Sequence, residues 1–261
     1  MNAALLLLAD SRLPAGGHGH SGGVEEAVRI GAIQDLPGLA AFLRGRLATA
    51  GLVTAALAAA ACEYAAVPGA FADGAGWARL DAEADARISS PAQREASRTQ
   101  GRLLLRTSRR IWPSPVLDAQ ARAVPQGVHH PLALGAVAAV AGCSPAEAAL
   151  AAAYTSVTAP ATAAVRLLGL DPVAVHRLLA DLAPALERVS AGVPAAPTLP
   201  TGPTGPTGSG GSARRAGSTA PESPGHPEDP EGWEALPAHA APALDLLAER
   251  HVRADLRLFV S

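Results

Sequence analysis

The sequence contains no lysine, few aromatic residues and only two cysteines among its 261 residues. The missing lysine excludes a self-contained Walker-type nucleoside triphosphatase, a Schiff-base enzyme and a pyridoxal-phosphate enzyme, because each of these needs that side chain. All cationic side-chain charge other than histidine is therefore on arginine, and the formal net charge is only −2. Since a nucleic-acid-binding domain normally carries a basic excess, we expect no nucleic-acid partner.

The cysteines and the apolar runs indicate a cytoplasmic protein. Cys62 and Cys143 stand singly in Ala-rich or Leu-rich stretches, which is typical of small buried side chains and not of disulfides or metal sites. The apolar run Ala3–Ala9 has no basic residue before it, unlike a signal peptide. The longest apolar stretch, Leu47–Cys62, is rich in Ala and too weakly hydrophobic for a membrane span. We therefore expect no membrane partner.

Strand patterns are also scarce, whereas helical periodicity recurs along the chain. The sequence predicts an all-α fold: a single helical-bundle domain with a disordered Pro/Gly-rich insertion before the last helix. Several helices should begin with a capping residue followed by proline, as at Ser90-Pro91 and Ser144-Pro145. The expected helices are Val24–Ile30, Leu36–Tyr64, Asp73–Ile88, Ala92–Ile111, Pro131–Val140, Ala146–Val157, Pro160–Leu168, Asp171–Val189 and Ala241–Leu247.

The segment Gly192–Pro237 differs in composition from the rest of the chain. It is rich in Pro, Gly, Ser and Thr and has too few apolar side chains to offset the entropy of ordering it. We therefore divide the chain into a helical core at 1–191, a flexible linker at 192–237, and a C-terminal helix with a partner-docking tail at 238–261.

A Gly-x-Ser-x-Gly pattern around Ser21 raises the possibility of a serine hydrolase. In that fold the serine follows a strand and an oxyanion loop, and the roughly twenty residues upstream of Ser21 show neither. We prefer a Gly-rich turn before a helix, in which Glu25 complements the helix dipole. Hydrolysis by Ser21 is kept as the alternative.

Two histidine pairs could offer imidazoles to a metal ion. His18 and His20 lie in the Gly-rich loop, and His129 and His130 are adjacent. Nickel and zinc accept imidazole, but a firm site needs three or four converging ligands, and the sequence shows no such set. We predict no firmly bound metal or cofactor and keep His18 and His20 as candidates.

The end of the sequence is unusually apolar for a chain end. Arg257 lies within Leu256–Val260, where exposed apolar side chains would be unfavourable and where termini are normally polar. An arginine there can bind carboxylates or carbonyl oxygens through several donors. The pattern predicts a tail that docks onto a surface.

Taken together, the segments of the chain resemble the urease accessory protein UreF family. The opening resembles the family's Leu-rich start and Gly-Gly/Ser-His-Ser loop, although His18 and Gly19 replace an aromatic residue and a serine. Val252 also replaces the usual Glu after the tail histidine. The matching positions are Asp10, Ser11, Leu13, Pro14, Gly16, Gly17, His20, Ser21, Gly23 and Glu25; Glu95, Ser97, Arg98, Gly101, Leu103 and Leu104; His130, Pro131 and Gly135; Ala163–Leu167; and Pro242, Asp245, His251, Arg257, Leu258, Phe259 and Ser261.

The resemblance implies a urease maturation factor and not an enzyme. UreF proteins are all-α homodimers that join UreD (also called UreH) and the GTPase UreG, so that nickel is delivered into the urease apoprotein. The lysine-free chain agrees, because the GTPase must then be a separate subunit. The apolar surface predicted on Pro131–Leu168 also favours a dimer. The resemblance places partner binding at Arg257, Leu258, Phe259, His251 and Arg166, and the surplus of arginine leaves a regulator of the GTPase, an activator or a gate, as a variant.

Overall fold

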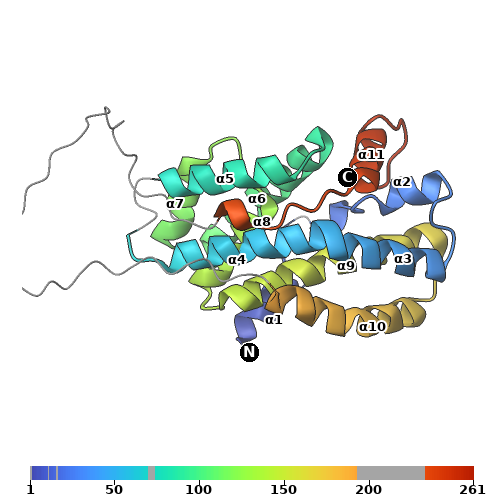
Figure 1. Ribbon diagram of the computed structural model, residues 1–261, viewed down its shortest axis with the longest axis horizontal. Helices are drawn as coiled ribbons and strands as arrows, with labels where there is room; N and C mark the ends of the chain where they lie inside the picture. Colours follow the sequence, from blue (N-terminus) through green and yellow to red (C-terminus); the bar gives the residue numbers. More distant parts are fainter. Residues whose placement is uncertain (1, 11, 16, 70–73, 193–232) are drawn as a thin grey trace, which may run out of the picture.

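The computed structural model describes residues 2–10, 12–15, 17–69, 74–192 and 233–261, and these form an all-α bundle without strands (Figure 1). The elements are α1 (Ala3–Ala9), η1 (Gly17–Gly19), α2 (Val24–Arg29), α3 (Leu36–Arg46), the π segment η2 (Leu47–Gly51), α4 (Leu52–Ala66), α5 (Ala75–Arg87), α6 (Pro91–Ile111), α7 (Pro115–Ala123), α8 (His130–Val140), α9 (Pro145–Leu168), α10 (Pro172–Ala191), η3 (Trp233–Ala235) and α11 (Pro242–Val252).

One long rod, formed by α3, η2 and α4, runs through the middle of the molecule (Figure 1). Its α4 part is Ala-rich and is buried on nearly all sides, as expected for a helix that is apolar all round. Helices α8 and α5 contact one side of the rod, and α6 and α7 pack against α8 on that side. Helices α9 and α10 pack along the other side. The core consequently has two apolar clusters, and α4 contributes residues to both of them.

Local capping chemistry explains where several helices begin. Asp35 accepts a hydrogen bond from the Gly38 amide at 2.8 Å and caps α3. Ser90 caps α6, and Ser144 forms a full capping box with Glu147 at the start of α9. The expected helix starts at these positions are therefore confirmed.

The structure joins two helices that were expected to be separate. Ala146–Val157 and Pro160–Leu168 belong to one continuous helix, α9, with Pro160 inside it. Proline removes a backbone donor, which leaves the carbonyl of the residue four positions earlier without its usual bond. The Arg46 Nε donates to that carbonyl, Ser156 O, at 2.8 Å. The arginine thus supplies the donor that the proline lacks.

The segment predicted to be a linker was drawn too far towards the C-terminus. Residues 193–232 lie outside the described part of the chain, so the prediction stands untested there. Trp233 and Leu236, however, are buried in the core. The Trp233 ring lies 5.4 Å from the Tyr64 ring, and Arg87 donates to the carbonyl oxygens of Trp233, Glu234 and Leu236. The boundary at 237 is therefore corrected to a point before Trp233.

Two helices are apolar and long enough to span a membrane by length and composition alone. These are Leu36–Ala66 and Pro145–Leu168, and 61% and 56% of their apolar windows are buried inside the bundle. Such burial is typical of core helices. The apolar surface of α8 is likewise buried within the chain, so α8 does not supply the exposed face on which the dimer argument relied.

Candidate functional site

The Gly-rich loop and the end of the chain lie against each other, although about 240 positions separate them. The Val260 amide donates to Gly19 O at 2.6 Å, and the Ser21 amide donates to Ser261 O at 2.5 Å. The Ser21 hydroxyl donates to the same oxygen at 3.0 Å, and His20 Nδ1 lies 2.5 Å from Ser261 Oγ. We call residues 17–25, His251 and 256–261 the loop–tail junction.

Glycine allows the loop to turn sharply into α2. Gly22 and Gly23 have φ values of 61° and 92°, which lie in the left-handed region that side chains disfavour. A Cβ on Gly22 would also press against Pro160 and against the Arg46 guanidinium. The Arg46 Nη1 donates to Gly22 O at 2.9 Å and fastens the turn to the bundle.

Glu25 holds the tail through its carboxylate. Its two oxygens accept hydrogen bonds from the Leu258 amide at 2.6 Å and from the Phe259 amide at 3.1 Å. His251 completes the clamp, with Nε2 at 3.2 Å from Phe259 O and Nδ1 at 3.7 Å from a Glu25 oxygen. Sequence reasoning assigned Glu25 only to the helix dipole, because a bond to a distant backbone amide leaves no pattern in the sequence.

The predicted partner-binding residues separate into two groups. His251 and Phe259 are buried and hold the tail in place. Arg257 and Leu258 are exposed. Arg257 makes no hydrogen bond or ion pair with any described residue, so its guanidinium does not anchor the tail to the described part of the bundle. Arg166 is exposed on α9, far along the sequence from the tail.

The rest of the predicted loop is only partly described. Pro14 is exposed, and its carbonyl accepts a hydrogen bond from the Thr107 hydroxyl at 2.9 Å. Gly17 is exposed at the start of η1. Gly16 and the side chain of His18 lie outside the described residues.

Ser21 lacks the surroundings of a hydrolase nucleophile. Its side chain is fully buried, and its hydroxyl is bonded to Ser261 O. The adjacent imidazole, His20, is bonded to Ser261 Oγ and not to Ser21. A nucleophilic serine needs an accessible oxygen and a base that takes its proton.

The described residues contain one group with the spacing of metal ligands, and it is not the predicted one. Asp81, Asp85 and His129 have ligand atoms within 4.8 Å of one another. Arg98 already occupies this site, because its Nη2 lies 2.8 Å from Asp81 and 2.7 Å from Asp85. His20 belongs to no such group. A cation at Asp81 and Asp85 would have to displace a guanidinium.

The same group forms a polar network that fixes the start of α8. His129 Nε2 lies 2.9 Å from Asp85, and its Nδ1 lies 3.1 Å from Ser97 Oγ, while the His130 amide donates to the same hydroxyl at 3.1 Å. Arg98 also donates to Gly127 O at 2.6 Å. Burial lowers the pKa of His129, which favours a neutral ring. We call Asp81, Asp85, Ser97, Arg98 and His129 the Arg98 network.

Two motif glycines allow close helix contacts beside this network. A Cβ on Gly101 in α6 would overlap the carbonyl oxygen of Val128, and a Cβ on Gly135 in α8 would overlap that of Ala58 in α4. These motif positions therefore serve the architecture of the bundle. They bring α6 and α4 against α8 and place His130 at the wall of a cavity.

The chain is similar to known proteins over most of its length. The family model described as UreF matches residues 33–183, which is more than half of the chain. The chain belongs to the UreF family. It is 50% identical over 187 residues to the urease accessory protein UreF of Mycobacterium sp. (strain JLS), covering 72% of this chain and 82% of that protein.

Two further UreF relatives show the same extent of similarity. The urease accessory protein UreF of Mycolicibacterium vanbaalenii is 48% identical over 189 residues, with 72% of this chain and 84% of that protein covered. The protein of the same name from Mycobacterium tuberculosis (strain H37Rv) is 43% identical, with coverages of 72% and 83%. The UreF model spans α3 to most of α10, including the Arg98 network, but neither side of the loop–tail junction.

Proposed function

We propose that the chain is a cytoplasmic urease maturation factor without catalytic activity of its own. In this role it joins UreD/UreH and the GTPase UreG, and the assembly delivers nickel into the urease apoprotein. Family membership and the names of the relatives support urease maturation. The observation that carries the scaffold role is the tail: its backbone is bonded to the bundle, while most of its side chains point outward.

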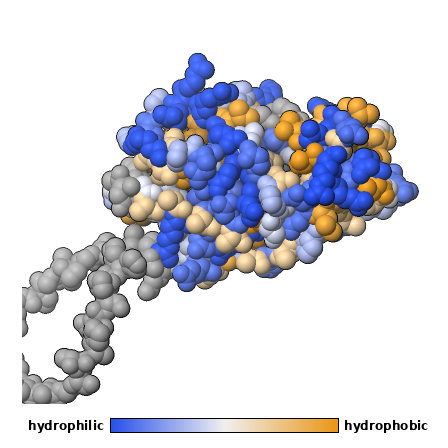
Figure 2. Space-filling view, turned by 90° about the horizontal axis from the view of Figure 1, so that it is seen from above, coloured by the Kyte–Doolittle hydropathy of each residue, from blue (hydrophilic) through white to orange (hydrophobic). Residues whose placement is uncertain are grey.

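The outward side chains form an apolar surface beside arginines. Leu256 and Leu258 are 90% and 80% exposed, and Figure 2 shows hydrophobic atoms gathered at the end of the molecule that carries α2 and α11. We call the exposed apolar residues of α11 and the tail the C-terminal apolar surface; they are Leu246, Val252, Leu256, Leu258 and Val260. Clustered exposed apolar side chains are typical of protein-binding sites. Arg257 adds a free guanidinium for a partner carboxylate.

Nickel is assigned to the complex and not to a resident site in this chain. The described cluster of metal-ligand type is bonded to Arg98, and His20 is bonded to the tail. These bonds support a role in which the chain positions partners that carry the cation. The homodimer stays part of the proposal, and light scattering of the full chain tests it.

Regulation of the partner GTPase is the second candidate. Arg166 and Arg257 are exposed and form no ion pair with a described residue, as an arginine acting in another subunit would require. No comparable observation supports the hydrolase alternative, because the Ser21 hydroxyl is buried and already donates a hydrogen bond to Ser261 O.

The scaffold role is tested by Arg257→Ala in pull-downs with UreD and UreG, run beside a melting curve. The exposed side chain should leave the melting temperature within about 2 °C, since surface substitutions change stability little. Assembly with the partners and urease activation should both fall. Arg177→Ala, an exposed arginine on α10, is the matched control and should assemble normally. Normal assembly and activation by Arg257→Ala would remove the tail from the interface.

A further inference from the structure

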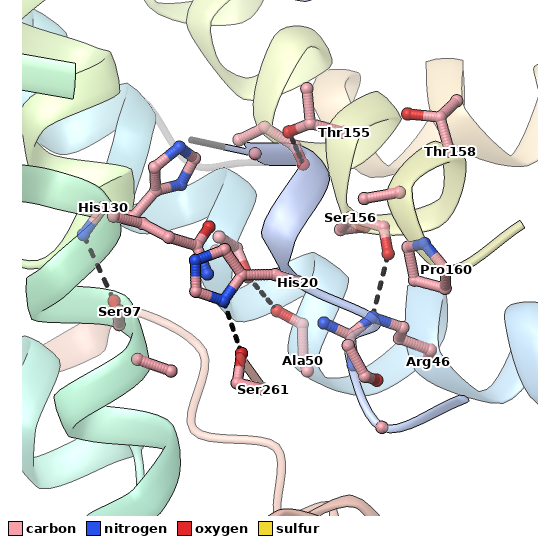
Figure 3. A pocket seen from close by; sticks show the side chains of 18 of the residues that line it. His20, Arg46, Ala50, Ser97, His130, Thr155, Ser156, Thr158, Pro160 and Ser261 are labelled. Atoms are coloured by element: carbon pink, nitrogen blue, oxygen red, sulfur yellow. Dashed lines mark hydrogen bonds between the residues drawn. The ribbon is translucent and has the colours of Figure 1, made fainter. Parts of the chain in front are cut away.

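A cavity of about 880 Å³ lies between the Gly-rich loop, the π segment η2, α9, α6 and the start of α8 (Figure 3). Its volume is that of a site for a small organic molecule. Apolar side chains, among them Val53, Leu57 and Leu134, make up much of its wall. Ser261 and Phe259 of the tail close part of it. The roles proposed above involve residues at its edge, such as Arg166 and the tail, but they assign no ligand to the space itself.

Arg46 is an unbalanced positive charge in the cavity wall. Its Nε and Nη1 are bonded to two carbonyl oxygens, Ser156 O and Gly22 O, and no carboxylate of a described residue lies within ion-pair distance of it. Its Nη2 makes no hydrogen bond with a described residue. Burial lowers the pKa of Arg46 to about 10, because the charged form is desolvated there. Carbonyls need a donor but not a charge, so the charge itself has no partner among the residues that the structure describes.

The neighbouring titratable groups do not supply the missing negative charge. Figure 3 shows His20 between His130 and Arg46. Burial lowers the pKa of both imidazoles, that of His130 to about 4, so both are neutral near pH 7. The two wall carboxylates are engaged elsewhere, because Asp10 pairs with Arg12 and Asp245 accepts from Gln93 at 3.1 Å. Neutral imidazoles can still donate one hydrogen bond each.

The geometry points to a binding site for an organic monocarboxylate, with its carboxylate on Arg46 and its apolar body along the cavity wall. Arg46 balances one negative charge. Of the other two arginines that line the cavity, Arg87 is paired with Glu83 and Arg166 is exposed to solvent, so a phosphate dianion at Arg46 would leave a net negative charge beside the apolar wall. The planar guanidinium of arginine presents several N–H donors that match the two oxygens of a carboxylate. The apolar wall favours a hydrocarbon body, because its burial is favourable in proportion to area.

Octanoate is a suitable probe, and calorimetric titration of the full chain measures its binding. Octanoate should bind with saturable 1:1 stoichiometry, whereas acetate, 1-octanol and inorganic phosphate should each bind at least tenfold more weakly. Acetate lacks the apolar body, octanol lacks the charge, and phosphate lacks the body and carries more charge. Equal affinity for octanol or for phosphate would overturn the assignment, as would no binding of octanoate.

Two variants connect the binding to this cavity. Arg46→Gln keeps an amide donor for a carbonyl oxygen and removes the charge, and it should weaken octanoate binding at least tenfold. Ala50→Leu adds volume beside Arg46 in Figure 3 and should weaken binding while the charge remains. The matched control is Arg44→Gln, an exposed arginine on the same helix that does not line the cavity. Melting curves show whether each variant is folded. If Arg46→Gln folds and binds octanoate with unchanged affinity, the site is refuted. If Arg46→Gln does not fold, unchanged octanoate affinity in folded Ala50→Leu refutes it instead.

Discussion

Arg98 and Glu25 are both charged side chains that bond to several groups, but Arg98 lies inside the bundle and Glu25 lies at its edge. Arg98 lies between two aspartates of α5 that are buried or partly buried, and it also donates to the Gly127 carbonyl in the loop between α7 and α8. Glu25 instead accepts from two backbone amides of the tail, whose side chains at Leu256 and Leu258 remain exposed. Charge-assisted hydrogen bonds thus join helices of the bundle at Arg98 and hold the tail backbone in place at Glu25.

The difference separates motif residues that build the fold from those that present a surface. The Arg98 network joins α5, α6 and the start of α8, and nothing in it is left free for a partner. The loop–tail junction fixes a backbone and leaves its side chains outside. A substitution in the network should therefore change stability first, and one in the junction should change assembly first.

The largest effect is expected for Arg98→Met. This change leaves Asp81 and Asp85 beside each other without a cation, and breaking the buried Arg98–Asp81 pair costs about 3 kcal/mol or more. The melting temperature should fall by roughly 6–12 °C for a chain of this size. Arg102→Met is the control, because its ion pair with Glu95 is exposed and contributes less than about 1 kcal/mol. Equal losses in the two variants would mean that the network does not stabilise the bundle.

Gly135→Ala should lower the free energy of unfolding by about 1–3 kcal/mol, which is the usual cost of overpacking. The added methyl group would press on the Ala58 carbonyl and force α8 away from α4. Gly45→Ala in α3 is the matched control, since no atom lies within 4 Å of its new Cβ. That helix should gain about 0.5–1 kcal/mol. Urea unfolding of both variants measures the difference, and a gain in both would show that the helices are not in limiting contact.

A smaller change in stability is expected from the titration of His130. Its amide is bonded to Ser97 of the Arg98 network, and the residue lines the cavity beside the loop–tail junction. Its pKa is lowered from 6.5 to about 4, so between these values the unfolded chain binds more protons than the folded chain. Stability should therefore fall as pH falls through this window. His130→Gln should flatten that part of the profile, measured by urea unfolding at several pH values. His176→Gln, at an exposed histidine, is the matched control measured beside it. A profile that keeps its slope in His130→Gln would mean that other groups cause it.

The bundle was more predictable than the junction for a physical reason. Caps such as Ser90 and Ser144 act on residues two or three positions away, so the sequence shows them directly. The same Ser-Pro signal stands at Ser114, where α7 begins, although no helix was expected there. The pairing of Gly19 with Val260 is made by backbone atoms about 240 positions apart, and no side-chain pattern records it. An isolated Trp233 after the Pro/Gly-rich segment was the one available signal that the chain returns to the core there.

The smallest change in stability, and the sharpest test of the comparison, is expected for Glu25→Gln. The amide keeps one acceptor for the Leu258 or Phe259 amide but loses the charge that strengthens both bonds. Global unfolding should shift by no more than about 1 kcal/mol, because the tail buries little besides Phe259. Hydrogen exchange at Leu258, Phe259 and Val260 should accelerate, since the tail would open locally while the bundle stays closed. Glu95→Gln, which loses only an exposed pair, should leave exchange in the tail unchanged. Exchange that accelerates equally throughout the bundle would place Glu25 with Arg98, as a residue of the fold and not of the presented surface.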